Sequence, residues 1–399
     1  MNVTGTSHHH YMQRALRLAE GGRGRTSPNP MTGCVVVKDG RVIGEGVHER
    51  HGARHAEAAA LDACRENSEN PRGAHLYCNL EPCAAAYPGK LTPPCAAAIV
   101  RAGIAGVTVA TLDPNPHVSG AGVRLLREAG IAVTVGVEAE AALLLNVPFF
   151  TAAHYGRPYV HLKVAQSLDG RIAARGGDSR WITDAAARRV VHRMRAEHDA
   201  VLVGRGTALH DDPRLTVRDV EGGPGTANAP WRVVLDSRLA LPAAARLASD
   251  EHAARTIVLT TARADPARHR ELTARGVHVE VVAGGADGRT DLDDVLRALH
   301  ERGIRSLLVE GGGGVYTSFL RAGRCDRVTA FVAPLLIGDG IAAVGDLGTH
   351  RIAGAARLQS VTTTIINDQV MVSGYRDLGT LRRAVLPAGE AQPAVARAG

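Results

Sequence analysis

One histidine and two cysteines in the first quarter of the chain impose the strongest constraint on its fold. His55 lies two residues before Glu57, Cys83 follows one proline, and Cys95 follows two. One imidazole and two thiolates make a three-ligand zinc site, and a catalytic zinc keeps its fourth position open. Side chains two residues apart on a regular helix point in nearly opposite directions, so His55 and Glu57 can share a pocket only where a helix begins.

The order of these residues is typical of zinc-dependent nucleobase deaminases, in which zinc activates the water that attacks an amino-bearing ring carbon. Glu57 is not needed as a ligand, so it is the candidate for moving protons. Pro93 and Pro94 suit a helix start, whose positive terminus favours the Cys95 thiolate. Two other interpretations are a core histidine with two buried thiols and a non-catalytic zinc module, which more often has four ligands.

The bulk composition is that of a globular protein. A chain of 399 residues with 45% hydrophobic and 22% charged residues suits two domains of ordinary size. No apolar run approaches the length of a membrane span, and the N-terminus lacks a secretory pattern. Six cysteines are few for this length, and two belong to the zinc motif. We therefore expect a reducing, cytoplasmic location.

The net charge of +7 raises the question of a nucleic-acid partner. The basic residues are scattered, however, and aromatic residues that could stack on bases are only 3% of the chain. A nucleic-acid-editing deaminase is therefore a weaker hypothesis than an enzyme for a small phosphorylated substrate. Almost all basic residues are arginine, and lysine occurs only at Lys38, Lys90 and Lys163.

The first domain, residues 1–150, is predicted to be a mixed sheet covered by helices. Apolar residues at helical spacing predict a helix over 11–20. Strands over 33–37 and 41–47 flank Asp39-Gly40, a dipeptide typical of hairpin turns. Helices starting near 55 and 95 and over 123–129 then alternate with strands at 75–80, 106–112 and 131–137.

A second α/β domain, residues 157–378, follows an irregular seam predicted at 146–157, where Pro148 and Pro158 break regular structure. Its predicted strands are 159–166, 200–204, 232–236, 256–260 and 306–310, and its predicted helices are 184–197, 291–302 and 315–322. The domain closes with residues 326–337 and a hairpin that turns at Asn367-Asp368. Residues 379–399 lack a periodic apolar face, so we expect a disordered tail.

A glycine run marks a second candidate site. Glu310 and the glycines 311–314 follow an apolar strand and precede a helix. Glycines let backbone N–H groups approach a phosphate, and a helix terminus adds positive potential. Taken alone, a glycine run is weak evidence for a ligand site, and a plain tight turn is the favoured interpretation. The Gly-x-Gly-x-x-Gly fingerprint is absent from its usual early position, so a Rossmann domain is not expected.

Together with other segments, these motifs resemble the bifunctional deaminase–reductases of riboflavin biosynthesis over nearly the whole chain. The matching segments of the first domain are Pro28-Asn29-Pro30, 33–37, His48, 55–57, 81–83, 92–95 and 113–116. Those of the second domain are Lys163, 167–170, 179–183, Gly206-Thr207, 211–218 and 309–314. The resemblance implies a cytidine-deaminase-like α/β/α domain followed by a dihydrofolate-reductase-like α/β domain. It also implies deamination of a phosphoribosylated diaminopyrimidine and NADPH-dependent reduction of the ribosyl to a ribityl chain.

The resemblance implies a role for each matching residue. His55, Cys83 and Cys95 are the implied Zn²⁺ ligands, and Glu57 is the proton carrier. The implied deaminase substrate contacts are Asn29, His48 and Lys90. The implied reductase substrate contacts are Lys163, Ser179, Arg195, Leu215, Arg218 and Glu310. The implied NADPH contacts are Trp181, Thr207, Asp211, Gly311, Gly312, Gly313 and Gly314. Arg195 as a surface charge and Trp181 as a core residue are the alternatives.

One segment departs from the family pattern. The family usually carries a short histidine-containing segment between the two cysteines, whereas this chain has a longer run, 84–91, that begins with three alanines. Lys90 remains as a cation for the substrate phosphate. We therefore expect weaker deamination of the riboflavin precursor, or activity on a related aminopyrimidine. The expected partners are a phosphorylated pyrimidine and further copies of the chain, with no nucleic acid or membrane.

Overall fold

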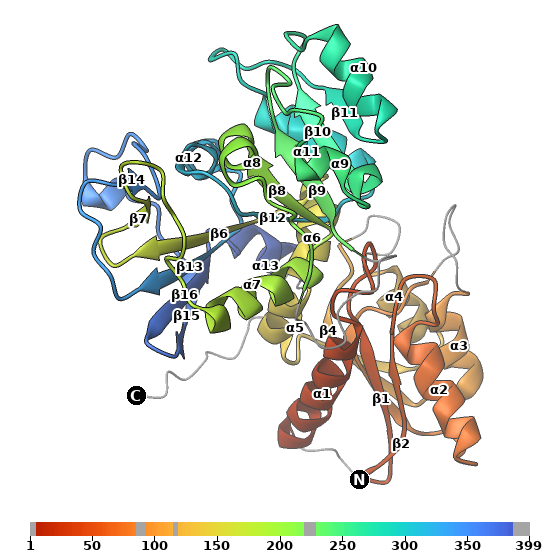
Figure 1. The fold of residues 1–399 in the computed structure, drawn as a ribbon. Helices are drawn as coiled ribbons and strands as arrows, with labels where there is room; N and C mark the ends of the chain where they lie inside the picture. The colour runs from red at the N-terminus through yellow and green to blue at the C-terminus, as the bar shows by residue number, and fades with distance from the viewer. Residues whose placement is uncertain (1–4, 85–92, 115–118, 219–228, 386–399) are drawn as a thin grey trace. The chain divides into compact units, whose positions relative to one another are not determined.

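The computed structural model describes residues 5–84, 93–114, 119–218 and 229–385. The chain forms two compact units (Figure 1). The first unit combines the chain up to Tyr155 with the segment that starts at Gly379, and the second unit runs from Gly156 to Leu378. Each unit has its own sheet and its own hydrophobic clusters.

The first unit is built on a five-stranded mixed sheet in the order β2-β1-β3-β4-β5. The strands are β1 (Gly33–Lys38), β2 (Arg41–Val47), β3 (His75–Leu80), β4 (Gly106–Thr111) and β5 (Ala132–Val135). β1 pairs antiparallel with β2 and β3, whereas β3, β4 and β5 are parallel. The predicted hairpin and mixed sheet are confirmed.

Helices cover both faces of this sheet. They are α1 (Gly5–Ala19), η1 (Glu20–Gly22), α2 (Ala56–Glu66), α3 (Cys95–Ala102), α4 (Ala121–Glu128), α5 (Ala139–Leu145), α6 (Val147–Tyr155) and α13 (Gly379–Val385). Met12 of α1 and Ala142 of α5 pack with Val35 on one face, whereas α2, α3 and α4 pack with Val36 on the other. Neighbouring strand residues point to opposite faces, so β1 contributes to both layers.

Close contact between α2 and β2 fixes where α2 begins. A Cβ atom at Gly46 would lie 2.1 Å from the Ala56 carbonyl oxygen and 2.4 Å from the Ala60 nitrogen. Only glycine allows the first turn of α2 to approach β2 this closely. Because His55 is the residue before that turn, this contact also holds the first zinc-ligand candidate in place.

The second unit is built on a nine-stranded sheet in the order β11-β10-β9-β8-β12-β6-β13-β16-β15. Its strands are β6 (Tyr159–Ser167), β8 (Ala200–Gly204), β9 (Trp231–Leu235), β10 (Thr256–Thr260), β11 (His278–Val281), β12 (Ser306–Val309), β13 (Arg327–Ala333), β15 (Gln359–Ile366) and β16 (Gln369–Tyr375). A separate two-stranded sheet pairs β7 (Arg171–Ala173) with β14 (Ile341–Ala342). The strands from β11 to β13 are parallel, and β16 and then β15 are added at that edge by antiparallel pairing.

Helices cover both faces of the large sheet as well. The helical segments of this unit are α7 (Ala185–Ala196), α8 (Arg205–Asp211), α9 (Arg246–Ser249), η3 (Ala253–Arg255), α10 (Pro266–Ala274), α11 (Leu292–Glu301), α12 (Gly313–Arg321) and the exposed η4 (Ile352–Gly354). Leu299 of α11 and Phe319 of α12 pack with Leu307 of β12 on one face. On the other face, Val191 of α7 packs with Leu308. Each fully buried aliphatic side chain of this kind contributes about 1.5–3 kcal/mol to folding.

Two sequence expectations are wrong. The predicted irregular seam at 146–157 is instead helix α6 through Tyr155, because Pro148 occupies the first turn of that helix, where a missing N–H costs nothing. The predicted disordered tail is helical over Gly379–Val385, because Leu381 and Val385 are buried against the first unit. The rest of that segment, 386–399, lies outside the described residues.

No helix in the described part of the chain is both long and apolar enough to cross a membrane.

Candidate active sites

The three predicted zinc ligands converge in the first unit. Cys95 is the first residue of α3, and His55 directly precedes α2. The Cys95 Sγ lies 3.4 Å and the Cys83 Sγ 3.7 Å from the His55 Nδ1, and all three donor atoms lie within 4.8 Å of one another. The predicted helix starts are confirmed.

These distances fit a zinc ion. Zinc binds sulfur at about 2.3 Å and nitrogen at about 2.0–2.1 Å, so tetrahedral ligands lie about 3.5 Å apart. The backbone N–H of Cys95 donates a hydrogen bond of 3.3 Å to the Cys83 Sγ, which favours a thiolate at that position. The donor set leaves one tetrahedral position for water, as in catalytic sites.

Glu57 lies in the first turn of α2, and its side chain is only 5% exposed. Burial and the neighbouring Cys83 raise the pKa of the Glu57 carboxyl, while the nearby His55 opposes that change. A carboxyl group whose pKa is raised toward neutrality is suited to accept a proton and give it back.

Asn29 and His48 adjoin this cluster, as the sequence predicts. The His48 Nδ1 lies 2.9 Å from the Arg54 carbonyl oxygen and must donate to it, so the His48 Nε2 accepts the 3.2 Å hydrogen bond from the Asn29 Nδ2. The His48 ring packs edge-on against His55, with 5.5 Å between ring centroids. Burial lowers the pKa of His48, which keeps the ring neutral.

Sequence reasoning missed Glu81 as a supporting residue. Its carboxylate is 3% exposed and accepts hydrogen bonds from the backbone N–H groups of Asp113 (3.2 Å), Gly120 (2.8 Å) and Val123 (3.1 Å). Glu81 is two residues before Cys83, so it anchors the segment that carries this ligand. The only sequence signal is its position beside the Pro-Cys dipeptide. Lys90, the predicted phosphate contact, lies outside the described residues.

In the second unit, Lys163, Arg195 and Glu310 form a buried charge cluster. The Arg195 Nε and Nη2 donate to the two Glu310 carboxylate oxygens at 2.6 and 2.8 Å, and the Lys163 Nζ lies 4.0 Å from the Glu310 Oε2. The Arg195 Nη1 also donates to the Thr216 carbonyl oxygen at 2.8 Å. Arg195 is therefore not a surface charge but holds the loop that contains Leu215.

Burial alone would raise the pKa of Glu310, but Arg195 and Lys163 outweigh burial and hold it at about 2. Burial also lowers the pKa of Lys163, against the attraction of Glu310. One carboxylate thus shares two cations, which leaves the cluster with a net positive charge of the kind that attracts a phosphate.

The glycine run lies between β12 and α12, as predicted. A Cβ atom at Gly311 would lie 2.8 Å from the Thr207 Oγ1, and Gly312 has a φ of +83°. Glycine is therefore required at both positions. Gly314 faces open space and can admit a ligand to the start of α12.

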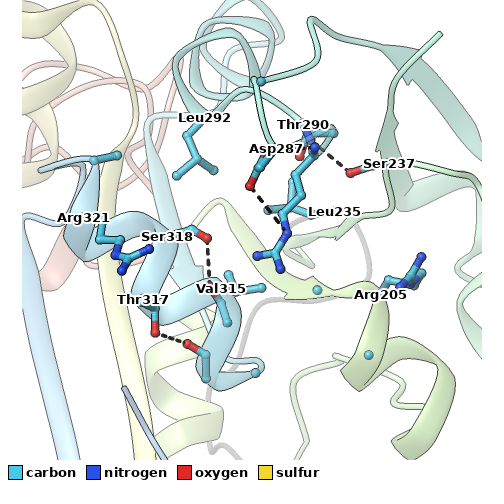
Figure 2. A pocket seen from close by; sticks show the side chains of 18 of the residues that line it. Arg205, Leu235, Ser237, Asp287, Thr290, Leu292, Val315, Thr317, Ser318 and Arg321 are labelled. Carbon is cyan, nitrogen blue, oxygen red and sulfur yellow. Dashed lines mark hydrogen bonds and ion pairs between the residues drawn. The ribbon is translucent and has the colours of Figure 1, made fainter. Parts of the chain in front are cut away.

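A pocket of about 1250 Å³ opens beside this run, at the carboxyl ends of β8, β9 and β12 (Figure 2). Thr207 and the glycines 312–314 line it together with Leu235 and Ser237, which sequence reasoning missed. The Thr290 N–H donates to the Ser237 Oγ at 3.0 Å. Clefts at the carboxyl ends of parallel strands are the usual ligand sites of open α/β sheets.

The pocket is rich in arginine: Arg205, Arg238, Arg263, Arg289 and Arg321 line it. Three of them bind the protein itself, namely Arg263 to the Gly288 carbonyl oxygen (3.5 Å), Arg289 to Asp287 (3.6 Å) and Arg321 to Asp346 (3.2 Å). Within the described ranges, Arg205 and Arg238 have no hydrogen-bond or ion-pair partner. The volume, the glycine run and the unpaired cations fit an anionic dinucleotide.

The structure also describes the remaining residues that the sequence predicts to contact the substrate or NADPH in the second unit. Leu215 packs in the core and is 3% exposed, so only its backbone could contact a substrate. Trp181 is 69% exposed, with the Arg188 guanidinium 4.2 Å from its ring centroid, so it is not a core residue. The Arg180 Nη2 donates to the Asp211 carbonyl oxygen at 3.1 Å. The Arg218 N–H donates to the His192 Nδ1 at 3.3 Å, and His192 is close enough to Arg195 and Glu310 for both to affect its pKa.

The fold and the two sites define a zinc-dependent deaminase unit joined to a reductase unit with an open parallel sheet. Family models agree: residues 5–111 match the cytidine and deoxycytidylate deaminase zinc-binding region, and residues 158–372 match the RibD C-terminal domain. The chain belongs to the RibD family, the bifunctional deaminase–reductases of riboflavin biosynthesis.

Relatives cover almost the whole chain. The riboflavin biosynthesis protein RibD of Aquifex aeolicus is 43% identical over 91% of this chain and 96% of its own length. The Escherichia coli RibD is 37% identical over 88% and 94%. A structure of Acinetobacter baumannii RibD superposes with a TM-score of 0.81 at 36% identity, and it covers 93% of this chain and 99% of that one. A Thermotoga maritima diaminohydroxyphosphoribosylaminopyrimidine deaminase/5-amino-6-(5-phosphoribosylamino)uracil reductase gives 0.80 at 37%, with the same coverage.

Proposed function

We propose that His55, Cys83 and Cys95 hold the zinc of the deaminase, that Glu57 moves its protons, and that the pocket beside the glycine run holds NADPH for the reductase. The substrate of the first reaction is 2,5-diamino-6-(5-phosphoribosylamino)pyrimidin-4-one. The observation that carries the proposal is the convergence of three zinc-compatible donor atoms and one buried carboxyl at two helix starts.

The residues around the zinc site have separate roles in deamination. When bound, zinc makes a water molecule nucleophilic at neutral pH. The Glu57 carboxylate accepts a proton from the attacking water and returns it to the departing ammonia. Asn29, oriented by its hydrogen bond to His48, offers its amide to the ring of the substrate.

The reductase site binds and orients its reactants. When bound, NADPH supplies the hydride that converts the ribosyl group to a ribityl chain. The backbone N–H groups at the start of α12 receive the cofactor pyrophosphate. Lys163, whose pKa is lowered by burial, lies beside Glu310 at the carboxyl end of β12 and faces the polar part of the substrate.

Strand order suggests which residues would hold each end of the dinucleotide. If the pyrophosphate lay over β12 and the nicotinamide faced Lys163 of β6, the adenosine would extend over β8 and β9. Arg205 follows β8, and Ser237 follows β9. We assign the 2′-phosphate to Arg205 because it is an unpaired guanidinium, within the described ranges, at that side of the run (Figure 2).

A related aminopyrimidine in a specialised pathway is the second candidate substrate. The observation that favours it is the segment 84–91, in which alanines replace the histidines that the family usually carries. Both candidates use the same zinc chemistry, so products rather than metal content distinguish them.

We also propose a cellular compartment and an oligomeric state for the enzyme. The six cysteines all lie in the described residues, are buried and form no disulfide, which supports a reducing compartment such as the cytoplasm. The edge strand β15 exposes Val361 and Ile365, which supports a homo-oligomer. Light scattering on the purified protein at several concentrations would test the oligomer.

Mass spectrometry of products formed from the riboflavin precursor tests the function. We expect the deaminated ribosyl compound without NADPH and the deaminated ribityl compound with it. If neither forms while a related aminopyrimidine is converted, the specialised substrate is correct. If a zinc-loaded protein converts neither compound, the proposed deaminase assignment is wrong.

A further inference from the structure

Helix α13 follows the reductase unit in the sequence but belongs to the deaminase unit (Figure 1). Leu381 and Val385 are 2% and 1% exposed. The Arg382 Nε and Nη2 donate to the two Glu140 carboxylate oxygens at 2.8 and 2.5 Å, which ties α13 to α5. A paired carboxylate–guanidinium contact of this kind fixes orientation as well as position.

A short path of hydrogen bonds leads from α13 to the zinc-ligand segment. The Val385 carbonyl oxygen accepts the Leu112 N–H at 2.9 Å, at the carboxyl end of β4. The next residue, Asp113, donates its N–H to Glu81, and the Glu81 N–H donates to the Thr111 carbonyl oxygen at 3.0 Å. Glu81 is two residues from Cys83.

We infer that α13 is a positioning element of the deaminase, which fixes the end of β4 and, through Glu81, the segment that presents Cys83. The helix lies beyond the residues matched by both family models, 5–111 and 158–372. The inference rests on the proposed assignment of Cys83 as a zinc ligand.

The physical reason is the cost of a buried carboxylate. Glu81 is 3% exposed, so its negative charge requires the N–H groups that surround it. One of those groups belongs to Asp113, and without Val385 the chain before Asp113 loses the backbone partner that holds it. The Glu81–Cys83 segment would then be less fixed, although no zinc ligand is removed.

Two matched pairs of variants, one of truncations and one of point substitutions, test the inference. Truncation before Gly379 is compared with truncation after Val385, and Arg382→Ala is compared with Arg383→Ala, because Arg383 lies on the exposed side of the same helix. We expect the longer truncation and Arg382→Ala to lower deaminase kcat/KM at least about tenfold, the scale of losses from supporting residues around metal sites. These two variants should also lose zinc faster to a chelator, whereas their NADPH-dependent reduction of the deaminated substrate stays unchanged.

A charge exchange separates positioning from general stability. Arg382→Glu with Glu140→Arg should restore deaminase kcat/KM relative to Arg382→Glu alone. If truncation before Gly379 leaves zinc retention and deaminase kcat/KM unchanged, or lowers only the melting temperature, the inference is wrong. Glu57→Gln is the parallel control: its full deaminase activity would instead overturn the proposed site itself.

Discussion

Glu57 is the residue on which deamination depends most directly. Glu57→Gln keeps the size of the side chain but cannot accept and return a proton, so we expect deaminase kcat to fall by about 10²–10⁴. Zinc content should remain at one per chain, because Glu57 is not a ligand. Metal analysis and ammonia release measure the two results. Glu66→Gln, an exposed change on the same helix, is the control, and full activity of Glu57→Gln would contradict the assignment.

Arg205 is the residue that should decide the preference for NADPH over NADH. A charge-assisted hydrogen bond contributes about 1.5–3 kcal/mol, so Arg205→Ala should raise the KM for NADPH by about 10–100-fold. The KM for NADH, which lacks the 2′-phosphate, should change little.

Steady-state reduction with each cofactor measures the ratio. Arg321→Ala is the matched control, because Arg321 lines the same pocket but pairs with Asp346. An equal rise in both KM values would show that Arg205 does not contact the 2′-phosphate.

At the scale of elements, a pair of histidines joins β6 to the residues that directly follow α7. The His161 Nδ1 and the His198 Nε2 lie 3.3 Å apart, the His161 Nε2 lies 2.8 Å from the Thr329 Oγ1, and the His198 Nδ1 donates to the Met194 carbonyl oxygen at 2.7 Å. Burial lowers the pKa of both rings, and Arg327 adds to this. Glu197 and Asp199 oppose the change at His198 without reversing it.

Because of this histidine pair, we expect the reductase unit to become less stable as the pH falls. Because both pKa values are below 6.5 in the folded state, the unfolded chain binds more protons as the pH falls. The stabilisation is complete above about pH 6.5 and is lost below it, by at most about 1.4 kcal/mol per pH unit for each ring. His161→Gln should make the free energy of unfolding less dependent on pH between about 7 and 5.

Tryptophan fluorescence during urea unfolding measures this effect selectively. The chain has two tryptophans, Trp181 and Trp231, and both lie in the second unit. His210→Gln, an exposed change on α8, is the control. Parallel pH profiles for the wild type and His161→Gln would show that the pair does not set the acid sensitivity.

At the scale of the whole molecule, the two units have separate cores, so we expect them to fold separately. A fragment of residues 156–378 should reduce the deaminated precursor with NADPH and contain no zinc, since His55, Cys83 and Cys95 all lie outside it. Metal analysis and NADPH oxidation test this. A folded fragment that neither binds NADPH nor reduces the precursor would contradict the independence of the units.

The sequence predictions that the structure confirms came from local patterns in the sequence. His55, Cys83 and Cys95 were identifiable because zinc chemistry restricts ligand types and helix starts restrict spacing. The long apolar strands of both sheets were identifiable because burial on two faces leaves a continuous apolar run. The failures share one cause: α6 and α13 have weak local signals, and burial against distant segments decides their structure.

The sequence by itself predicted the metal-ligand set, the glycine run and the α/β class, because local patterns identify each of them: Pro-Cys dipeptides and helix starts, adjacent glycines, and alternating strands and helices. Only the tertiary structure decided which residues support them. Glu81 meets Asp113, Arg195 meets Glu310, and Arg382 meets Glu140 across 32 to 242 positions of sequence. Hydrogen-bond partners so far apart leave no periodic pattern, since the fold alone brings them together.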